Sequence, residues 1–423
     1  MHCLVIGATG YIGALLVPRL LADGHSVACL VRDEAKLARH DWADRVDVHV
    51  GDVADPVAVG AACRGAEALF YLVHSMDGPG FEGRDRHAAE TVAAAARDAG
   101  VARIVYLGGL QPAGVATSPH LASRREVGEI LLASGVPTAV LQAGIVVGSG
   151  SASFEIIRSL TEASPVLPMP DHAWNRVQPI GIDDVLHHLV AAASLAPEVS
   201  GSFDIGGADV LTYRELMTTY AEIAGLPRPV TVPVPVSMPR LTARVAAVVT
   251  PADRHLVAPL LVSMAHDLVC RTASPTDPPP GGPTSYAEAV RRAVRDGSGR
   301  EFVTERVDAV PAPVSALWDV IAGVGGDTGW YSVPGLFAAR DRWAVADVEP
   351  GHVLRLRSEV ALPGAATLEL RAERVELHTS RLVLRAAFRP CGAAGLVYGR
   401  AHAPARKFLL AVLARTIARV AAR

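Results

Sequence analysis

The feature that most constrains this chain is a glycine-rich turn near its N-terminus. Residues 4–6 are apolar and predict a strand, residues 14–21 predict a helix, and the turn between them reads G-A-T-G-Y-I-G. In such a unit the first glycine permits the tight turn, the second lets backbone amides approach a pyrophosphate, and the third lets the helix pack on the strand. The helix N-terminus then favours a bound anion. We therefore predict a dinucleotide site formed by Gly7, Thr9, Gly10, Tyr11, Ile12 and Gly13.

A position that reads the adenosine ribose follows the second predicted strand. That strand covers residues 26–31 and ends at Arg32 and Asp33. Arg32 could make charge-assisted hydrogen bonds to a 2′-phosphate, whereas Asp33 would favour a free 2′-hydroxyl if it pointed inward. Because Arg32 lies one residue closer to the strand, we predict NADP as the cofactor, with NAD as the alternative.

Length and composition favour a two-domain globular protein. The 423 residues are too many for one ordinary core, and 50% of them are hydrophobic while 20% are charged. The net charge of −3 gives no reason to expect a nucleic acid or another polyanion as partner. The five cysteines form no C-x-x-C pair and no metal-ligand spacing, so we expect reduced thiols, no metal and a cytoplasmic setting.

No membrane or targeting segment is expected. The chain starts directly with the first predicted strand, which leaves no room for a signal peptide. The most apolar later stretch, residues 241–270, is interrupted by prolines and charged residues, which excludes a simple transmembrane span. Helices predicted in this stretch either line an apolar pocket or form the face of a homodimer.

The spacing G-x-x-G-x-x-G resembles the fingerprint of extended and atypical short-chain dehydrogenase/reductases, and the resemblance covers most of residues 1–298. It implies an α/β fold, a doubly wound parallel Rossmann sheet that binds NAD(P) at the carboxyl ends of its strands. By the same resemblance, Asp52 and Val53 lie beside the adenine, and Val73 and His74 lie where the ribose and nicotinamide pass. A helix-capping role for Asp52 is the alternative.

The residues that normally perform the chemistry of this family are absent. Its members carry a Ser after the fifth strand and a Y-x-x-x-K on the next helix, where the Tyr protonates the nascent alkoxide and the Lys lowers its pKa and holds the ribose. By resemblance these positions fall at residues 108–109, His120 and Arg124. Arg124 could still bind the ribose but cannot donate a proton at neutral pH.

His120 is the candidate catalytic acid, since an imidazole has an ordinary pKa of about 6.5. Its alternative is a solvent-facing residue at the start of a helix, which we predict to run from Ser123 as its cap. Tyr71 and Tyr106 also carry phenols, but both lie inside apolar strands and are expected in the core.

Later motifs predict a lobe that binds substrate. Residues 142–148 resemble the R-P-G-x-V-x-G segment of the family, and a helix predicted at 154–160 would form a wall of the cleft. Residues 177–185 match the late motif of extended members, in which Asp183 and Asp184 are expected to cap a helix.

A second domain with a different pattern follows residues 296–299. A strand, an amphipathic helix, three strands and a C-terminal helix predicted at 406–421 succeed one another. This order resembles the helix-grip fold of the START and polyketide-cyclase (SRPBCC) superfamily, and the resemblance covers residues 299–423. It implies a smaller α+β domain that holds an apolar ligand, while a packing or dimerisation module is equally open.

Two functions are compatible with these features. The first is an NADP-dependent oxidoreductase that acts on a small hydrophobic molecule without the usual Ser-Tyr-Lys triad and uses His120 as proton donor. The second is a non-catalytic dinucleotide-sensing or scaffold protein, which the missing triad motivates directly.

Overall fold

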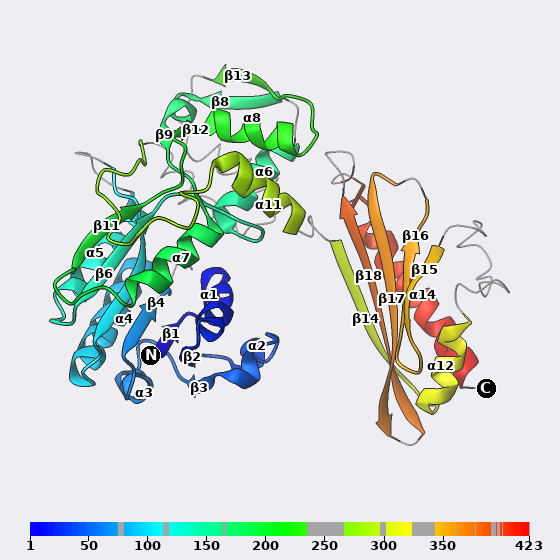
Figure 1. The fold of residues 1–423 in the computed structure, drawn as a ribbon. Helices are drawn as coiled ribbons and strands as arrows, with labels where there is room; N and C mark the ends of the chain where they lie inside the picture. The colour runs from blue at the N-terminus through cyan, green and yellow to red at the C-terminus, as the bar shows by residue number, and fades with distance from the viewer. Residues whose placement is uncertain are drawn as a thin grey trace. The chain divides into compact units, whose positions relative to one another are not determined.

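The structure is a computed structural model, and it describes residues 1–74, 80–112, 118–163, 166–234, 266–296, 302–323, 343–360, 362–376, 378–390, 395, 398–399 and 401–422. The chain folds as two compact units, Met1–Asp296 and Gly297–Arg423 (Figure 1). The expected helices of residues 241–265 lie outside the described part of the chain. Among the helices that are described, none is long and apolar enough to cross a membrane.

The first unit is built on a seven-stranded sheet in the order β11-β6-β5-β4-β1-β2-β3, in which all neighbouring strands are parallel. The order reverses at β1, since the chain moves from β1 to β2 on one side and later to β4 on the other. Ligands bind at such a switch point in parallel sheets. The strands are β1 His2–Ile6, β2 Ser26–Val31, β3 Asp47–Val50, β4 Ala68–Tyr71, β5 Arg103–Gly109, β6 Thr138–Ala143 and β11 Gly201–Ile205.

Helices cover both faces of this sheet (Figure 1). Leu16 of α1 and Leu189 of α7 pack on one face, and Val59 of α3, Val92 of α4 and Leu131 of α5 pack on the other. Because both faces are buried, the central strands are continuously apolar rather than alternating. The predicted doubly wound α/β fold is confirmed. The helices are α1 Tyr11–Ala22, α3 Pro56–Cys63, α4 Phe81–Asp98, α5 Pro119–Leu132 and α7 Ile182–Ala192.

A lobe with its own apolar core lies beyond the carboxyl ends of the strands. Helices α6 (Ala152–Ala163), α8 (Tyr213–Ile223) and α11 (Tyr286–Asp296) meet there, and β8 (Val166–Pro170) pairs in parallel with β13 (Val230–Val234). The Tyr220 hydroxyl on α8 donates to Glu162 on α6, which also pairs with Arg158. The position of α6 is therefore fixed by polar contacts on the side of α8.

Two predicted helix caps are wrong. Asp55, not Asp52, caps α3 by accepting from the Val57 amide at 2.9 Å, because the helix begins at Pro56. Ser118, not Ser123, caps α5, which begins four residues earlier than expected at Pro119. Ser123 lies within the helix, and its buried hydroxyl donates to Asp85 at 3.1 Å.

Asp183 and Asp184 are not caps either, because α7 begins at Ile182 and its cap position is Gly181. The buried Asp184 accepts from the amide and the hydroxyl of Thr284, both at 2.7 Å. Asp183 pairs with Arg292 at 3.1 Å. Both aspartates therefore join α7 to chain that lies about a hundred residues later, a role that local sequence does not reveal.

The second unit is a five-stranded antiparallel sheet in the order β14-β18-β17-β16-β15. Helices α12 (Val314–Ala322) and α14 (Ala403–Ala421) contribute Leu317 and Leu413 to a core with the sheet residues Leu354, Leu370 and Leu384. The prediction of a smaller α+β domain after the Rossmann domain is confirmed. Strand β15 was not predicted. The strands are β14 Phe302–Val310, β15 Trp343–Glu349, β16 Val353–Ser358, β17 Gly364–Glu376 and β18 Thr379–Pro390.

The buried His188 of α7 predicts a pH-dependent stability. Its Nδ1 lies 2.6 Å from the Thr276 hydroxyl, and burial, followed by the nearby His187, lowers its pKa to about 4. Between that value and about 6.5 the unfolded chain binds a proton that the folded chain does not, so stability falls as pH falls through this window, by up to roughly 1.4 kcal/mol per pH unit. His188→Gln should show a smaller loss of melting temperature between pH 7 and pH 4.5 than the wild type. The neighbouring variant His187→Gln removes only the smaller of the two causes that lower the pKa and should change the slope less than His188→Gln does. Equal slopes for both variants would contradict the assignment.

Candidate cofactor and substrate site

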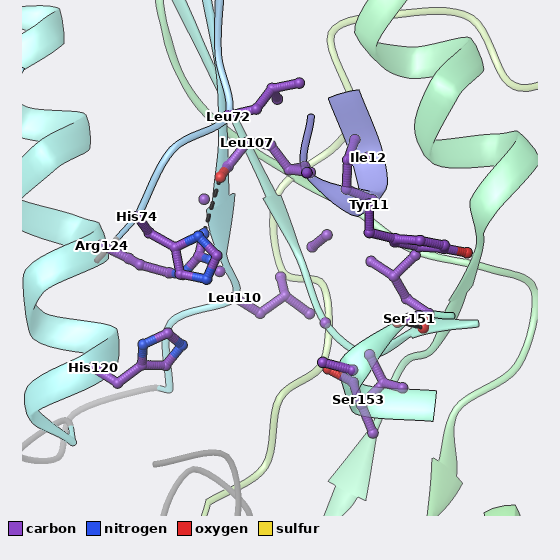
Figure 2. A pocket seen from close by; sticks show the side chains of 18 of the residues that line it. Tyr11, Ile12, Leu72, His74, Leu107, Leu110, His120, Arg124, Ser151 and Ser153 are labelled. Atoms are coloured by element: carbon purple, nitrogen blue, oxygen red, sulfur yellow. Dashed lines mark hydrogen bonds between the residues drawn. The ribbon is translucent and has the colours of Figure 1, made fainter. Parts of the chain in front are cut away.

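A cavity of about 480 Å³ opens at the carboxyl ends of β1, β4 and β5. It begins at the glycine loop after β1, passes Val73 and His74 after β4, and continues past Gly108 and Gly109 at the end of β5. Figure 2 shows Tyr11 and Ile12 on one side and His74, His120 and Arg124 on the other. The cavity therefore lies at the switch point of the sheet, where the fold favours a dinucleotide.

The glycine loop has the geometry that a pyrophosphate requires. Gly7 has φ +98°, a conformation that favours glycine, and a Cβ on Gly13 would overlap the carbonyl oxygen of Gly7. A Cβ on Gly10 would meet only that same oxygen, at 3.3 Å. No side chain caps α1, and its first turn carries no acidic residue. The first amides of α1 are thus left for an anion in the cavity.

The two ribose-reading candidates are placed differently. Arg32 is exposed, lines the cavity and has no ion-pair partner among the described residues. Asp33 caps the short helix α2 (Glu34–Leu37) by accepting from the Ala35 amide at 3.0 Å. Since the Asp33 carboxylate serves its own helix, Arg32 is the side chain left to face a 2′-phosphate.

Asp52 and Val53 do not line the cavity. Asp52 accepts from the Ala54 amide at 2.9 Å within its own turn, and Val53 packs against the core under α3 and α4. The other residues predicted to bind the cofactor lie together around the cavity, namely Gly7, Thr9, Gly10, Tyr11, Ile12, Gly13, Arg32, Val73, His74 and Arg124.

His74, His120 and Arg124 form a cluster on one side of the cavity (Figure 2). The two imidazole rings lie 6.3 Å apart between centroids, and Arg124 Nη1 donates to the Leu107 carbonyl at 3.1 Å. His120 is only 7% exposed, so the alternative of a solvent-facing residue is wrong.

Both imidazoles of the cluster are uncharged at neutral pH. Burial, aided by the charge of Arg124, lowers the pKa of His120 to about 3. The charge of Arg124, together with burial and His120, holds the pKa of His74 well below its ordinary value. An uncharged imidazole can donate an N–H hydrogen bond but is a weak proton donor. If His120 were a catalytic imidazolium, the reaction rate should decrease as the pH rises through about 6.5. The lowered pKa of His120 gives no support to that expectation.

Neither the core tyrosines nor Tyr11 offers a phenol to the cavity beside the two histidines, where the catalytic tyrosine of the family was expected. Tyr71 and Tyr106 are buried in the sheet, as predicted, and burial raises the pKa of both phenols. Tyr11 lines the cavity, but its hydroxyl occupies the space beside Gly148, on the side away from the histidines (Figure 2). Tyr213 also lines the cavity and was missed, because the capping box at Thr212 predicts the start of α8 but not the direction of its first side chain.

The remaining wall of the cavity is mostly apolar, and its polar side chains are Ser151, Ser153 and Tyr213. Helix α6 lies where the cleft wall was predicted, and α8 and the chain after residue 266 complete the wall. Among the described residues that line the cavity there is no aspartate and no glutamate. The apolar side chains are Leu110, Ile145, Ile156, Ile157, Leu160, Met217 and Leu268.

Known proteins share this combination of loop and fold. Residues 7–144 match the NAD(P)H-binding family of domains. The chain is 29% identical over 238 residues to ceramide reductase of Caulobacter vibrioides, a match that covers 55% of this chain and 73% of that protein. It is also 29% identical over 276 residues to 3-diazoavenalumate denitrifying reductase of a Streptomyces species, covering 57% of this chain and 87% of that protein.

The crystal structure of the Citrobacter sp. triphenylmethane reductase complexed with NADP(H) has a similar fold. The TM-score is 0.53 at 20% identity, and the match covers 69% of this chain and 100% of that chain. The chain thus contains an NAD(P)-binding Rossmann domain that has reductases among its relatives. The predicted NAD(P)-binding domain is confirmed over residues 7–144, and the reductases among these similar proteins support the predicted oxidoreductase class.

Proposed function

We propose that this chain uses NADPH to reduce a small hydrophobic molecule without the Ser-Tyr-Lys triad. The observation that carries the proposal is that one cavity joins the glycine loop and Arg32 to an apolar wall formed by α6 and α8. A dinucleotide and an apolar molecule can therefore meet in the same space. The reductases among the relatives support the same reaction class.

The cofactor would be held by groups with distinct tasks. The amides at the start of α1 would bind the pyrophosphate, and Arg32 would bind the 2′-phosphate. Val73 would lie along the nicotinamide ribose, while His74 and Arg124 would lie beside the nicotinamide ring, where the substrate is reduced. When bound, NADPH supplies the hydride; the chain itself orients the two reactants and excludes water with the apolar side chains of α6 and α8.

A non-catalytic dinucleotide sensor is the second candidate. The positions of the Ser, Tyr and Lys hold Gly108 and Gly109, His120 and Arg124, and His120 is uncharged at neutral pH. Such a protein would bind NADPH without turning it over. Cofactor binding alone therefore does not decide between the two functions.

For the second unit, we propose the helix-grip fold over residues 299–423. The support is an antiparallel sheet with the long C-terminal helix α14 packed on one face. Either an apolar ligand or a packing role is compatible with that arrangement. For location we propose the cytoplasm, because the described cysteines Cys3, Cys29, Cys63 and Cys270 are free thiols.

The proposed function is tested by NADPH oxidation with three neutral acceptors, decanal, 2-decanone and menadione, and with the cationic dye crystal violet. We expect turnover with at least one of them, measured as loss of NADPH absorbance and confirmed by isolating the reduced product. NADPH binding without reduction of any acceptor would support the sensor instead.

Gly10→Val is expected to abolish cofactor binding without unfolding the chain. Gly10 has φ −80° and ψ 169°, an extended conformation that valine adopts, and its side chain would enter the space of the pyrophosphate. Calorimetry should show NADPH binding weakened by about 100-fold or more, since several charge-assisted hydrogen bonds are lost. Gly60→Val is the control, because a Cβ there meets nothing within 4 Å and the residue lies away from the cavity. Unchanged NADPH affinity in Gly10→Val would refute the assignment of the loop.

Arg32→Ala should remove the preference for NADP. Loss of charge-assisted bonds to the 2′-phosphate is expected to weaken NADPH binding by about 10- to 100-fold and to leave NADH binding nearly unchanged. Arg39→Ala, a nearby exposed arginine that does not line the cavity, should preserve the ratio of the two affinities. If both variants keep the wild-type ratio, Arg32 does not read the phosphate.

A further inference from the structure

The cavity carries positive charge that no carboxylate of its described lining balances. Arg32 and Arg124 are the charged side chains of that lining. Arg124 is partly buried, donates to the Leu107 carbonyl, and has no ion-pair partner among the described residues. The Leu107 carbonyl satisfies one N–H group of Arg124, but no carboxylate of the described lining neutralises its charge. A partly desolvated cation without a counter-ion is costly, and an oxygen with negative or partial negative charge on a bound molecule would offset that cost.

The N–H groups of the cluster come from two elements. His120 and Arg124 are four residues apart on α5 and therefore lie on the same face of the helix, one turn apart. His74 follows β4 and brings its ring to within 6.3 Å of His120. The hydrogen bond to Leu107 holds one end of the Arg124 guanidinium, and the buried Tyr106 phenol also interacts with this side chain. The remaining N–H groups of the guanidinium can donate to a ligand.

The apolar wall and the cluster belong to the same cavity. Ile156 and Leu160 of α6 and Met217 of α8 offer an apolar surface. Arg124 offers only donors, and each uncharged imidazole of His74 and His120 offers one N–H donor and one acceptor nitrogen. A cationic substrate would meet the charge of Arg124 and no carboxylate among the described lining residues. A neutral molecule with one polar oxygen would satisfy both surfaces.

We propose that His74, His120 and Arg124 bind the carbonyl oxygen of a neutral substrate whose apolar body lies against α6 and α8. This inference rests on the proposed function. In the balanced reaction, the carbonyl carbon gains a hydride, the π-electron pair of the C=O bond moves to oxygen, and a proton from water completes the alcohol, while NADPH becomes NADP⁺.

Arg124 stabilises the negative charge that develops on this oxygen, because a fixed cation acts strongly where water is excluded. The imidazoles are N–H donors to the same oxygen. Their depressed pKa values keep them uncharged at neutral pH, so that the cluster carries a single positive charge. The proton then comes from solvent, which removes the need for a side-chain acid.

The binding step can be tested without turnover. Decanoate carries an oxygen anion on an apolar chain and is not reduced by NADPH, and decyltrimethylammonium carries the opposite charge on the same chain. Calorimetry on NADPH-saturated protein should show decanoate binding at least about tenfold more tightly than the ammonium ion. Arg124→Gln should weaken decanoate binding by about 10- to 100-fold. Arg125→Gln is the matched control, because Arg125 is exposed and pairs with Glu129 at 3.5 Å.

The inference is overturned if decanoate binds equally to the Arg124→Gln and Arg125→Gln variants, or if the ammonium ion binds as tightly as decanoate. If any acceptor is reduced in the NADPH assay, the inference also requires that decanal or 2-decanone be reduced in preference to the cationic dye crystal violet. It further requires that Arg124→Gln lower kcat/KM at saturating NADPH. Arg124-dependent decanoate binding without reduction of any acceptor would uphold the oxygen site and refute the reductase. Reduction of acceptors without Arg124-dependent decanoate binding would support the reductase and refute the oxygen site.

Discussion

The close approach of Gly13 to the carbonyl oxygen of Gly7 is the constraint on which the cofactor side of the structure depends. Because residue 13 has no Cβ, α1 can start directly over the end of β1 and point its first amides at the switch point of the sheet. The buried residues Leu16 and Leu20 then hold the helix against the sheet. The position of an anion is thus fixed by backbone packing, and no side chain in the loop has to supply charge.

The apolar part of the cavity is formed by side chains rather than by backbone groups. Its walls are side chains of α6 and α8. The hydrogen bond from Tyr220 of α8 to Glu162 of α6, which also pairs with Arg158, joins the two helices. The cluster on α5 supplies the polar end. Burial there has two consequences: it lowers the pKa of His120, and it strengthens the influence of Arg124 on any oxygen nearby.

The sequence predicted the features of the fold that depend on residues close together in the chain. The glycine spacing and the alternation of strands and helices were sufficient for the Rossmann sheet, because both depend on residues that are neighbours in the chain. The prediction of the cap of α3 was wrong because two aspartates, Asp52 and Asp55, lie within a few residues of each other. A small shift of the helix start decides which of them is at the cap position. The partners of Asp184 and the burial of His120 depend on chain that is distant in sequence, and no periodicity encodes them.

The contact between Tyr11 and Gly148 ties the two halves of the cavity to each other. A Cβ on residue 148 would overlap the Tyr11 hydroxyl and crowd Ile182, so the loop that leads into α6 can lie where it does only while residue 148 is glycine. The two positions share one volume, so residue 148 cannot gain a side chain while residue 11 is tyrosine. A related sequence with a small residue at position 11 would be free to carry a side chain at position 148 only if the residue at position 182 also left room for it. In such a relative, the wall that faces the substrate could be reshaped from the cofactor loop.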